Sequence, residues 1–138
     1  MTARKAPFPV PADLEGRLER LGLEFLAEFL GRATTRHPDN VEALAELATT
    51  LTSLGRLEDG LAVDEQLVRL APRNATVHYN LACSLALLDR RESAFEALER
   101  AVQLGFQDQE CLRNDQDLAS LRADPRFRDL VQRLGKVT

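Results

Sequence analysis

The sequence predicts an all-α protein built from repeated helical hairpins, and two observations lead to this prediction. Leu and Ala supply 25 and 18 of the 138 residues, whereas Val supplies eight and Ile none. Leu and Ala favour helices and β-branched residues favour strands, so this composition argues against a β-rich fold. In addition, Pro38 and Pro72 lie 34 residues apart in similar turns, and a segment with helical periodicity follows each of them. Such a period indicates internal repeats within one domain.

The segment 41–74 shows how one unit is built. Its first half carries apolar residues at helical spacing from Leu44 to Leu51, which places them on one face of a helix. Gly55 interrupts this pattern, and a second apolar face continues until Pro72, whose ring and missing N–H end the helix. Two helices of about 14 residues joined by a short turn therefore account for the period.

Polar residues before each unit are typical of helix caps. Asp39 and Glu42 have the spacing of a capping box. Asn40 and Asn74 are also suitable, because an Asn side chain can accept a hydrogen bond from an unpaired N–H of the first helical turn. We therefore expect both units to begin with a capped helix.

The units 41–74 and 75–108 align position by position and resemble tetratricopeptide repeats. This resemblance is carried by Leu44, Leu47, Ala48, Leu51, Gly55, Leu57 and Pro72, and by Tyr79, Asn80, Leu81, Ala82, Leu85, Ala94, Ala101 and Leu104. The units depart from the family pattern at Gly60, Asp64, Leu67, Asp89 and Phe106. The resemblance implies a right-handed superhelical stack of antiparallel helical hairpins, which is a tetratricopeptide-like α-solenoid.

The N-terminal end of the repeat region differs from a complete unit. Three prolines occur within residues 1–11, which we expect to form an extended arm. Residues 12–40 are expected to form a degenerate first repeat, with a shortened helix over 12–20 and a second helix over 23–36. Because stacked repeats need end units, we interpret this divergent repeat as an N-terminal cap.

The C-terminal end departs from the period in another way. Residues 109–138 are expected to form a region of capping helices. The pattern predicts short helices over 108–113 and 117–122. Asp124 followed by Pro125 is a strong start signal for a last helix, because Asp can cap it and Pro fits its first position.

Charge and composition limit the classes of partner. The 18 basic and 22 acidic residues give a net charge of −4, which disfavours a nucleic-acid partner. The C-terminal arginines alternate with acidic residues and indicate a mixed surface; they are Arg122, Arg126, Arg128 and Arg133. No apolar stretch is long enough to span a membrane, and we expect no membrane partner.

The expected compartment is the cytoplasm. Residues 1–13 lack the apolar core of a secretory signal, and two cysteines are too few for a disulfide framework. The segment 121–127 resembles the Leu-Arg-x-Asp-Pro-Arg-Phe ending found after bacterial repeats of this type. These features favour a bacterial cytoplasmic protein.

The sequence offers few residues for catalysis or metal binding. The imidazoles and thiols are His37, His78, Cys83 and Cys111. His78 and Cys83 are five residues apart rather than four, and no paired-cysteine motif occurs. Glycines are scattered at turns, without a phosphate-binding loop. We therefore predict a non-enzyme with no catalytic residue, no metal and no cofactor.

The resemblance implies that the first helix of each repeat lines a concave groove that receives a peptide or protein. Carried over residue by residue, the groove positions are Glu42, Ala45, Thr49, Thr52, Ser53, Thr76, Tyr79, Asn80, Cys83, Ala86 and Leu87. In this family Asn80 matches an Asn that bonds the ligand backbone. Tyr79 is either an anchor for the ligand or a residue that packs against the preceding repeat.

The leading functional hypothesis is a non-catalytic adaptor or scaffold that binds a protein segment in this groove. Glu42 and Glu46 have the wrong charge for an acidic C-terminal tail, so an uncharged or mildly basic segment is the expected ligand. Two alternatives stay open. One is a cytoplasmic chaperone of a secreted protein, and the other is a structural subunit that self-assembles through Phe8, Phe25 or Phe29. The expected oligomeric state is a monomer or a weak homodimer.

Overall fold

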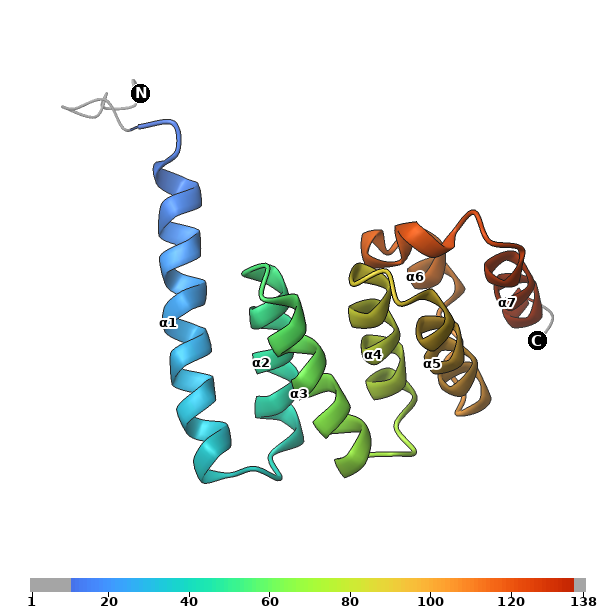
Figure 1. Cartoon of the computed structure of the whole chain (residues 1–138), viewed down its shortest axis with the longest axis horizontal. Coiled ribbons are helices and arrows are strands. Elements are labelled where there is room, and N and C mark those ends of the chain that lie inside the picture. Colours follow the sequence, from blue (N-terminus) through green and yellow to red (C-terminus); the bar gives the residue numbers. More distant parts are fainter. Residues whose placement is uncertain (1–10, 136–138) are drawn as a thin grey trace, which may run out of the picture.

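The computed structural model describes residues 11–135 and shows a stack of helices without strands in this range (Figure 1). The elements are α1 (Leu14–Arg36), α2 (Val41–Ser53), α3 (Leu57–Leu70), α4 (Ala75–Leu87), α5 (Arg91–Gln103), α6 (Gln109–Asn114), a 3-10 helix η1 (Gln116–Leu121) and α7 (Pro125–Gly135). The prediction of an all-α solenoid is confirmed. Most of the expected arm over 1–11, including Phe8, lies outside the described residues.

Two complete hairpins form the middle of the stack. Helix α2 packs against α3, and α4 packs against α5, with α3 and α4 in contact between the hairpins. A residue with positive φ follows the first helix of each hairpin: Gly55 at +76° and Asp89 at +57°. This left-handed conformation turns the chain back on itself, and the two positions are 34 residues apart.

Asparagine side chains cap the first helix of both hairpins. Asn40 accepts a hydrogen bond from the Ala43 N–H at 3.0 Å, and Asn74 accepts one from the Val77 N–H at 3.2 Å. The predicted Asn caps are confirmed. The capping-box expectation for Asp39 is wrong, because Asn40 occupies the cap position one residue later.

Helix α1 corrects the prediction of two helices in the first repeat. One continuous helix of 23 residues replaces the expected pair over 12–20 and 23–36. The only helix breaker between these segments is Gly22, and a single Gly costs a helix about 1 kcal/mol, which flanking Leu residues easily offset. Within residues 11–135, neither α1 nor any other helix has the length and apolar content needed to cross a membrane.

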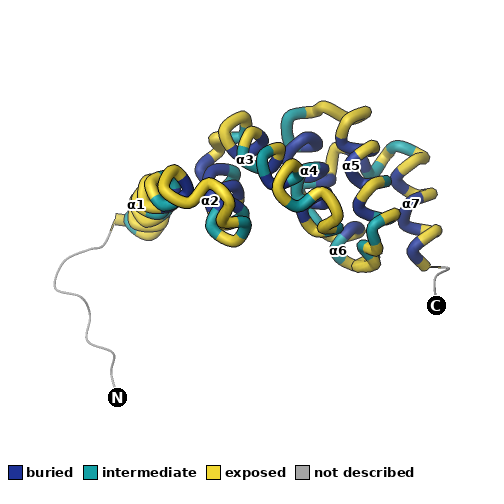
Figure 2. Tube along the Cα trace, turned by 90° about the horizontal axis from the view of Figure 1, so that it is seen from below, coloured by how far each residue is buried: buried dark blue, intermediate teal, exposed yellow. Residues whose placement is uncertain are grey.

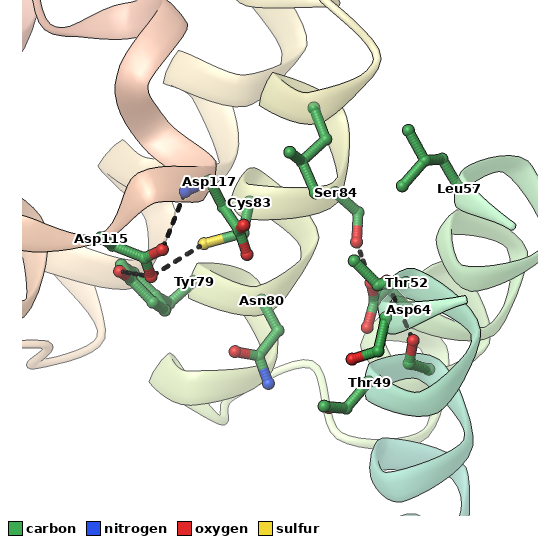
Figure 3. Close-up of a pocket in the computed structure, with 13 residues that line it drawn as sticks. Thr49, Thr52, Leu57, Asp64, Tyr79, Asn80, Cys83, Ser84, Asp115 and Asp117 are labelled. Carbon is green, nitrogen blue, oxygen red and sulfur yellow. Dashed lines mark hydrogen bonds between the residues drawn. The ribbon is translucent and has the colours of Figure 1, made fainter. Parts of the chain in front are cut away.

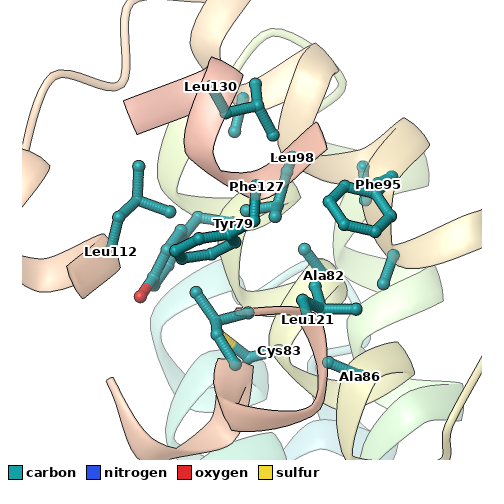
Figure 4. Close-up of a cluster of buried hydrophobic side chains, with 14 of the residues drawn as sticks. Tyr79, Ala82, Cys83, Ala86, Phe95, Leu98, Leu112, Leu121, Phe127 and Leu130 are labelled. Carbon is teal, nitrogen blue, oxygen red and sulfur yellow. The ribbon is translucent and has the colours of Figure 1, made fainter. Parts of the chain in front are cut away.

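The C-terminal segment forms part of the largest hydrophobic core. Four leucines of this segment are at most 1% exposed: Leu112, Leu118, Leu121 and Leu130. They pack with α4 and α5 around Ala82, Ala94 and Ala101, which have no exposed surface (Figure 4). Helices α6, η1 and α7 lie where short helices are expected after residue 108, and they close this end of the stack. Figure 2 shows the contrast with α1, most of which is exposed.

Ion pairs connect α7 to α5 across the surface of the cap. Arg126 forms a double hydrogen bond with Glu92 at 2.8 and 2.9 Å, and its guanidinium lies 4.2 Å from the centre of the Phe95 ring. Arg133 pairs with Glu99 further along the same two helices. Two of the C-terminal arginines thus contact acidic residues of the neighbouring helix.

The conformation of Asp89 leads to a stability prediction. Asp89→Gly should raise the free energy of unfolding by about 0.5–1 kcal/mol, because Gly adopts positive φ without steric cost. The reciprocal variant Gly55→Asp should lower it by about 1 kcal/mol. Urea unfolding followed by circular dichroism measures both. Equal stability of Asp89→Gly and wild type would show that Asp89 has no conformational cost in this turn.

Candidate ligand-binding groove

A pocket of about 440 Å³ opens between the first helices of the two complete hairpins (Figure 3). Helix α2 supplies one wall, α4 supplies the opposite wall, and the junction of α6 and η1 closes one side. The lining residues are Ala48, Thr49, Thr52, Ser53, Leu57, Asp64, Tyr79, Asn80, Cys83, Ser84, Leu87, Asp115 and Asp117.

Seven of the eleven predicted groove residues line this pocket, namely Thr49, Thr52, Ser53, Tyr79, Asn80, Cys83 and Leu87. Glu42, Ala45 and Thr76 do not line it, because they lie nearer the N-terminal ends of α2 and α4. Ala86 is 2% exposed, and its carbonyl accepts a hydrogen bond from the Ser120 hydroxyl. Its assignment to the groove surface is wrong, because the C-terminal segment covers it.

Asn80 is the polar residue of α4 that is best placed to contact a ligand. Its half-buried amide lies between the α2 and α4 walls, and no side-chain hydrogen bond joins it to any residue in the described range 11–135. By contrast, the Thr49 and Thr52 hydroxyls donate to the carbonyls of Ala45 and Ala48. The Asn80 amide therefore has both its donor and its acceptor available.

Tyr79 has a different role from either of the two predicted. The ring is 5% exposed and stacks on Phe106 with 4.4 Å between ring centres. Its hydroxyl donates to Asp115 at 2.6 Å and accepts from the Cys111 thiol at 3.2 Å. Tyr79 thus packs towards the C-terminal segment and offers too little surface to anchor a ligand.

Asp115 connects α4 to the C-terminal segment. One carboxylate oxygen accepts from the Tyr79 hydroxyl and from the Cys83 thiol, which lies at 3.7 Å. The other oxygen accepts from the Asp117 N–H at 3.0 Å and so caps η1. The Arg122 guanidinium donates to the Asp115 carbonyl. These contacts hold Asp115 and Asp117 at the edge of the pocket.

Asp64 supplies a further carboxyl group, on the opposite side of the pocket from Asp115 (Figure 3). Its side chain is 3% exposed on α3 and accepts a hydrogen bond from the Ser84 hydroxyl of α4. Burial raises the pKa of Asp64 to about 6, and the hydrogen bond from Ser84 partly opposes this rise. A protonated Asp64 is therefore favoured in mildly acidic solution.

The chemistry of the pocket is acidic and weakly nucleophilic. No Arg or Lys lines it, whereas three carboxyl groups do. Burial, followed by the charge of Asp115, raises the pKa of the Cys83 thiol well above its usual range, so the thiol stays protonated at neutral pH. The imidazole of His78 is engaged with the Pro72 carbonyl at 2.8 Å. This arrangement suits recognition of a neutral or cationic group.

Cys83, Asp115 and Asp117 also place three possible metal-ligand atoms within 4.8 Å of one another, a grouping that the sequence did not predict. Burial, followed by the charge of Asp115, raises the pKa of Asp117. The Asp115 carboxylate is already occupied by the hydrogen bonds from Tyr79 and Cys83. Hydrogen bonds within the protein therefore explain why Asp115 and Cys83 lie close together, without a bound metal ion.

Sequence reasoning missed six lining residues: Ala48, Leu57, Asp64, Ser84, Asp115 and Asp117. Asp64 had a local signal, because it is a charged residue on the apolar face that also contains Leu61 and Leu67. Asp115 and Asp117 had none, since they reach the pocket only when the chain after α5 folds back along α4.

The fold is that of a tetratricopeptide-like helical repeat. Two crystal structures of MamA, a protein that contains such repeats, resemble the chain. One has a TM-score of 0.68 at 18% identity and covers 87% of this chain and 66% of that chain. The other has a TM-score of 0.70 at 17% identity and covers 95% of this chain and 77% of that chain. At these identities the likeness concerns the fold.

A sequence relative is a chloroplastic protein from Arabidopsis thaliana. It is 32% identical over 85 residues, which represent 59% of this chain and 25% of the relative. The chain therefore spans about a quarter of the length of this relative. No protein-family model matches the chain.

The contacts of Asp115 predict a large effect of its removal. Asp115→Ala should lower the free energy of unfolding by about 2–4 kcal/mol, because the η1 cap is lost and the buried Tyr79 hydroxyl loses its acceptor. Asp115→Asn retains an acceptor oxygen, so it should lower the free energy of unfolding by less than about half of this amount. Tyr79 is the one tyrosine in a sequence without tryptophan, so its fluorescence during urea unfolding reports on this region. Equal losses in both variants would contradict the role of the acceptor.

The raised pKa of Asp64 predicts a pH-dependent stability. The folded value of about 6 exceeds the ordinary value of 3.8, so the folded state binds the proton more tightly and loses stability as pH rises from about 4 to 6. Asp64→Asn removes this loss while its amide oxygen still accepts from Ser84. It should be more stable than wild type by roughly 2 kcal/mol at pH 7.5 and by much less at pH 4.5. Thermal unfolding at both pH values tests this, and a pH-independent difference would refute it.

Proposed function

We propose that the protein is a non-catalytic interaction module that binds a neutral or basic protein segment in the pocket between α2 and α4. The observation that carries this proposal is Asn80, whose amide faces the pocket without a hydrogen-bonding partner among residues 11–135. An amide offers donor and acceptor groups, which match the C=O and N–H of a peptide backbone. A bound segment would therefore gain backbone hydrogen bonds at the centre of the groove.

The side chains around Asn80 support a peptide of particular chemistry. Thr49, Thr52 and Ser53 are small, so a backbone can approach the α2 wall closely. Leu57 and Leu87 add apolar surface, and Asp115 and Asp117 add negative charge at the cap side. The preferred segment is expected to combine a small or apolar residue over the leucines with an Arg or Lys that faces the two aspartates.

Selection of peptides on the immobilised protein tests this proposal. A random phage library should yield peptides that are enriched in Arg or Lys and depleted in Asp and Glu, because basic side chains complement Asp115 and Asp117. Fluorescence polarisation with a labelled selected peptide then gives its dissociation constant. Asn80→Ala should weaken binding about tenfold or more, since the peptide backbone loses its partner.

Gln103→Ala provides a matched control, because Gln103 is an amide on α5 that does not line the pocket. It should leave the dissociation constant unchanged. Asp117→Asn should weaken basic peptides more than neutral ones. Selected peptides that bind Asn80→Ala as tightly as wild type would show that the ligand site lies elsewhere.

A further inference from the structure

An apolar stripe runs along the outer face of α1. Within residues 11–135, five large hydrophobic side chains are exposed, and four of them belong to this helix: Leu18 at 59%, Leu21 at 61%, Phe25 at 73% and Phe29 at 60%. Their spacing places them within about 80° of the helix circumference. Exposed apolar groups gathered on one face are typical of an interaction surface.

The position of α1 explains why this stripe has no partner among residues 11–135. On its inner side, α1 buries Ala27, Leu30 and Thr34 and packs against α2. Helices α2 to α5 each have an antiparallel partner within their own hairpin, whereas α1 has none among the described residues (Figure 1). The stripe therefore lies on the open end of the stack, where a further antiparallel helix would continue the layers.

We propose that a second copy of this chain supplies the missing helix, so that two α1 helices pair antiparallel through their stripes. Placing Leu21 of one copy opposite Phe25 of the partner subunit puts Leu18 nearly level with Phe29 of the partner subunit. A helix of 23 residues is about 35 Å long, so the stripes overlap over several turns. The arrangement has two-fold symmetry and closes as a dimer.

The charges beside the stripe fit the antiparallel direction. Arg17 and Glu28 flank the same edge of the stripe, and an antiparallel pair brings equivalent edges together. Each already has an exposed partner within α1, because Arg17 lies 4.0 Å from Asp13 and Glu28 lies 2.6 Å from Arg32, so contacts across the dimer would add to these pairs. In the register above, Arg17 lies within one residue of the level of the partner's Glu28. A parallel pair in register would separate these two positions by 11 residues, or about 16 Å along the axis, so they could not interact. The charge pattern therefore favours the antiparallel pair.

This dimer goes beyond the proposed function, because no residue of the stripe lines the pocket. The two proposals can therefore fail separately. Peptide binding with a monomeric chain would leave the pocket assignment intact and overturn the dimer.

Sedimentation velocity of the full chain between about 5 and 500 µM tests the pairing. Wild type should show a reversible shift from monomer to dimer. Phe25→Glu should raise the dissociation constant of the dimer at least about a hundredfold, because each interface would bury two unpaired charges. Leu70→Glu is the matched control: Leu70 is an exposed leucine on α3, outside the stripe, and this variant should dimerise like wild type. Circular dichroism verifies that both variants remain folded.

Charge reversal tests the antiparallel register. Arg17→Glu alone and Glu28→Arg alone should each weaken the dimer about three- to tenfold, because like charges then meet at two symmetry-related places. The double variant that carries both changes should recover dimerisation, since each introduced carboxylate then faces an introduced guanidinium. In a parallel pair the two positions are too far apart to interact, so combining the changes brings no such recovery.

Three results would overturn this proposal. A wild-type chain that remains monomeric at the highest concentration would exclude pairing through α1. Dimerisation of Phe25→Glu equal to wild type would place the interface elsewhere. If the double variant dimerises no more tightly than either single variant, the antiparallel register is excluded.

Discussion

The hydrogen bonds that converge on Asp115 join helix α4 to the C-terminal segment that closes the stack. Asp115 accepts from Tyr79 and Cys83 on α4, and it also caps η1 through the Asp117 N–H. One side chain thereby fixes a helix of the second hairpin to the segment that closes the stack. The same contacts form the acidic edge of the pocket, so the stability of the cap and the shape of the groove are coupled.

The apolar surface at the two ends of the stack is covered to different extents. At the C-terminal end, short helices place Leu112, Leu118 and Leu121 against α4 and α5 and remove the apolar surface from water. At the N-terminal end, α1 buries only one side and exposes Phe25 and Phe29 on the other. Within residues 11–135, this asymmetry leaves most of the exposed large apolar side chains at one end of the molecule.

The contact between Asp64 and Ser84 shows how a polar interaction can define the register of two hairpins. Asp64 lies on α3 and Ser84 on α4, so their hydrogen bond crosses the seam between repeats. The desolvation of Asp64 is unfavourable when its carboxyl group is ionised, which is why burial raises its pKa. An apolar pair would avoid this cost but would leave no directional contact across the seam.

Local patterns in the sequence were sufficient to predict the helical repeat, its 34-residue period and the Asn caps. These features depend on spacing and on side-chain types that act within a few residues, as in Asn40 and Gly55. The resemblance to tetratricopeptide repeats, rather than a local pattern, indicated seven of the residues that line the pocket. The remaining features depend on tertiary structure. The expected first hairpin is fused into α1, because Gly22, the only Gly between the two expected helices, is a weak helix breaker. Ala86 is covered, Tyr79 is buried and Asp115 reaches the pocket because the chain after α5 folds back along α4, which no local pattern encodes.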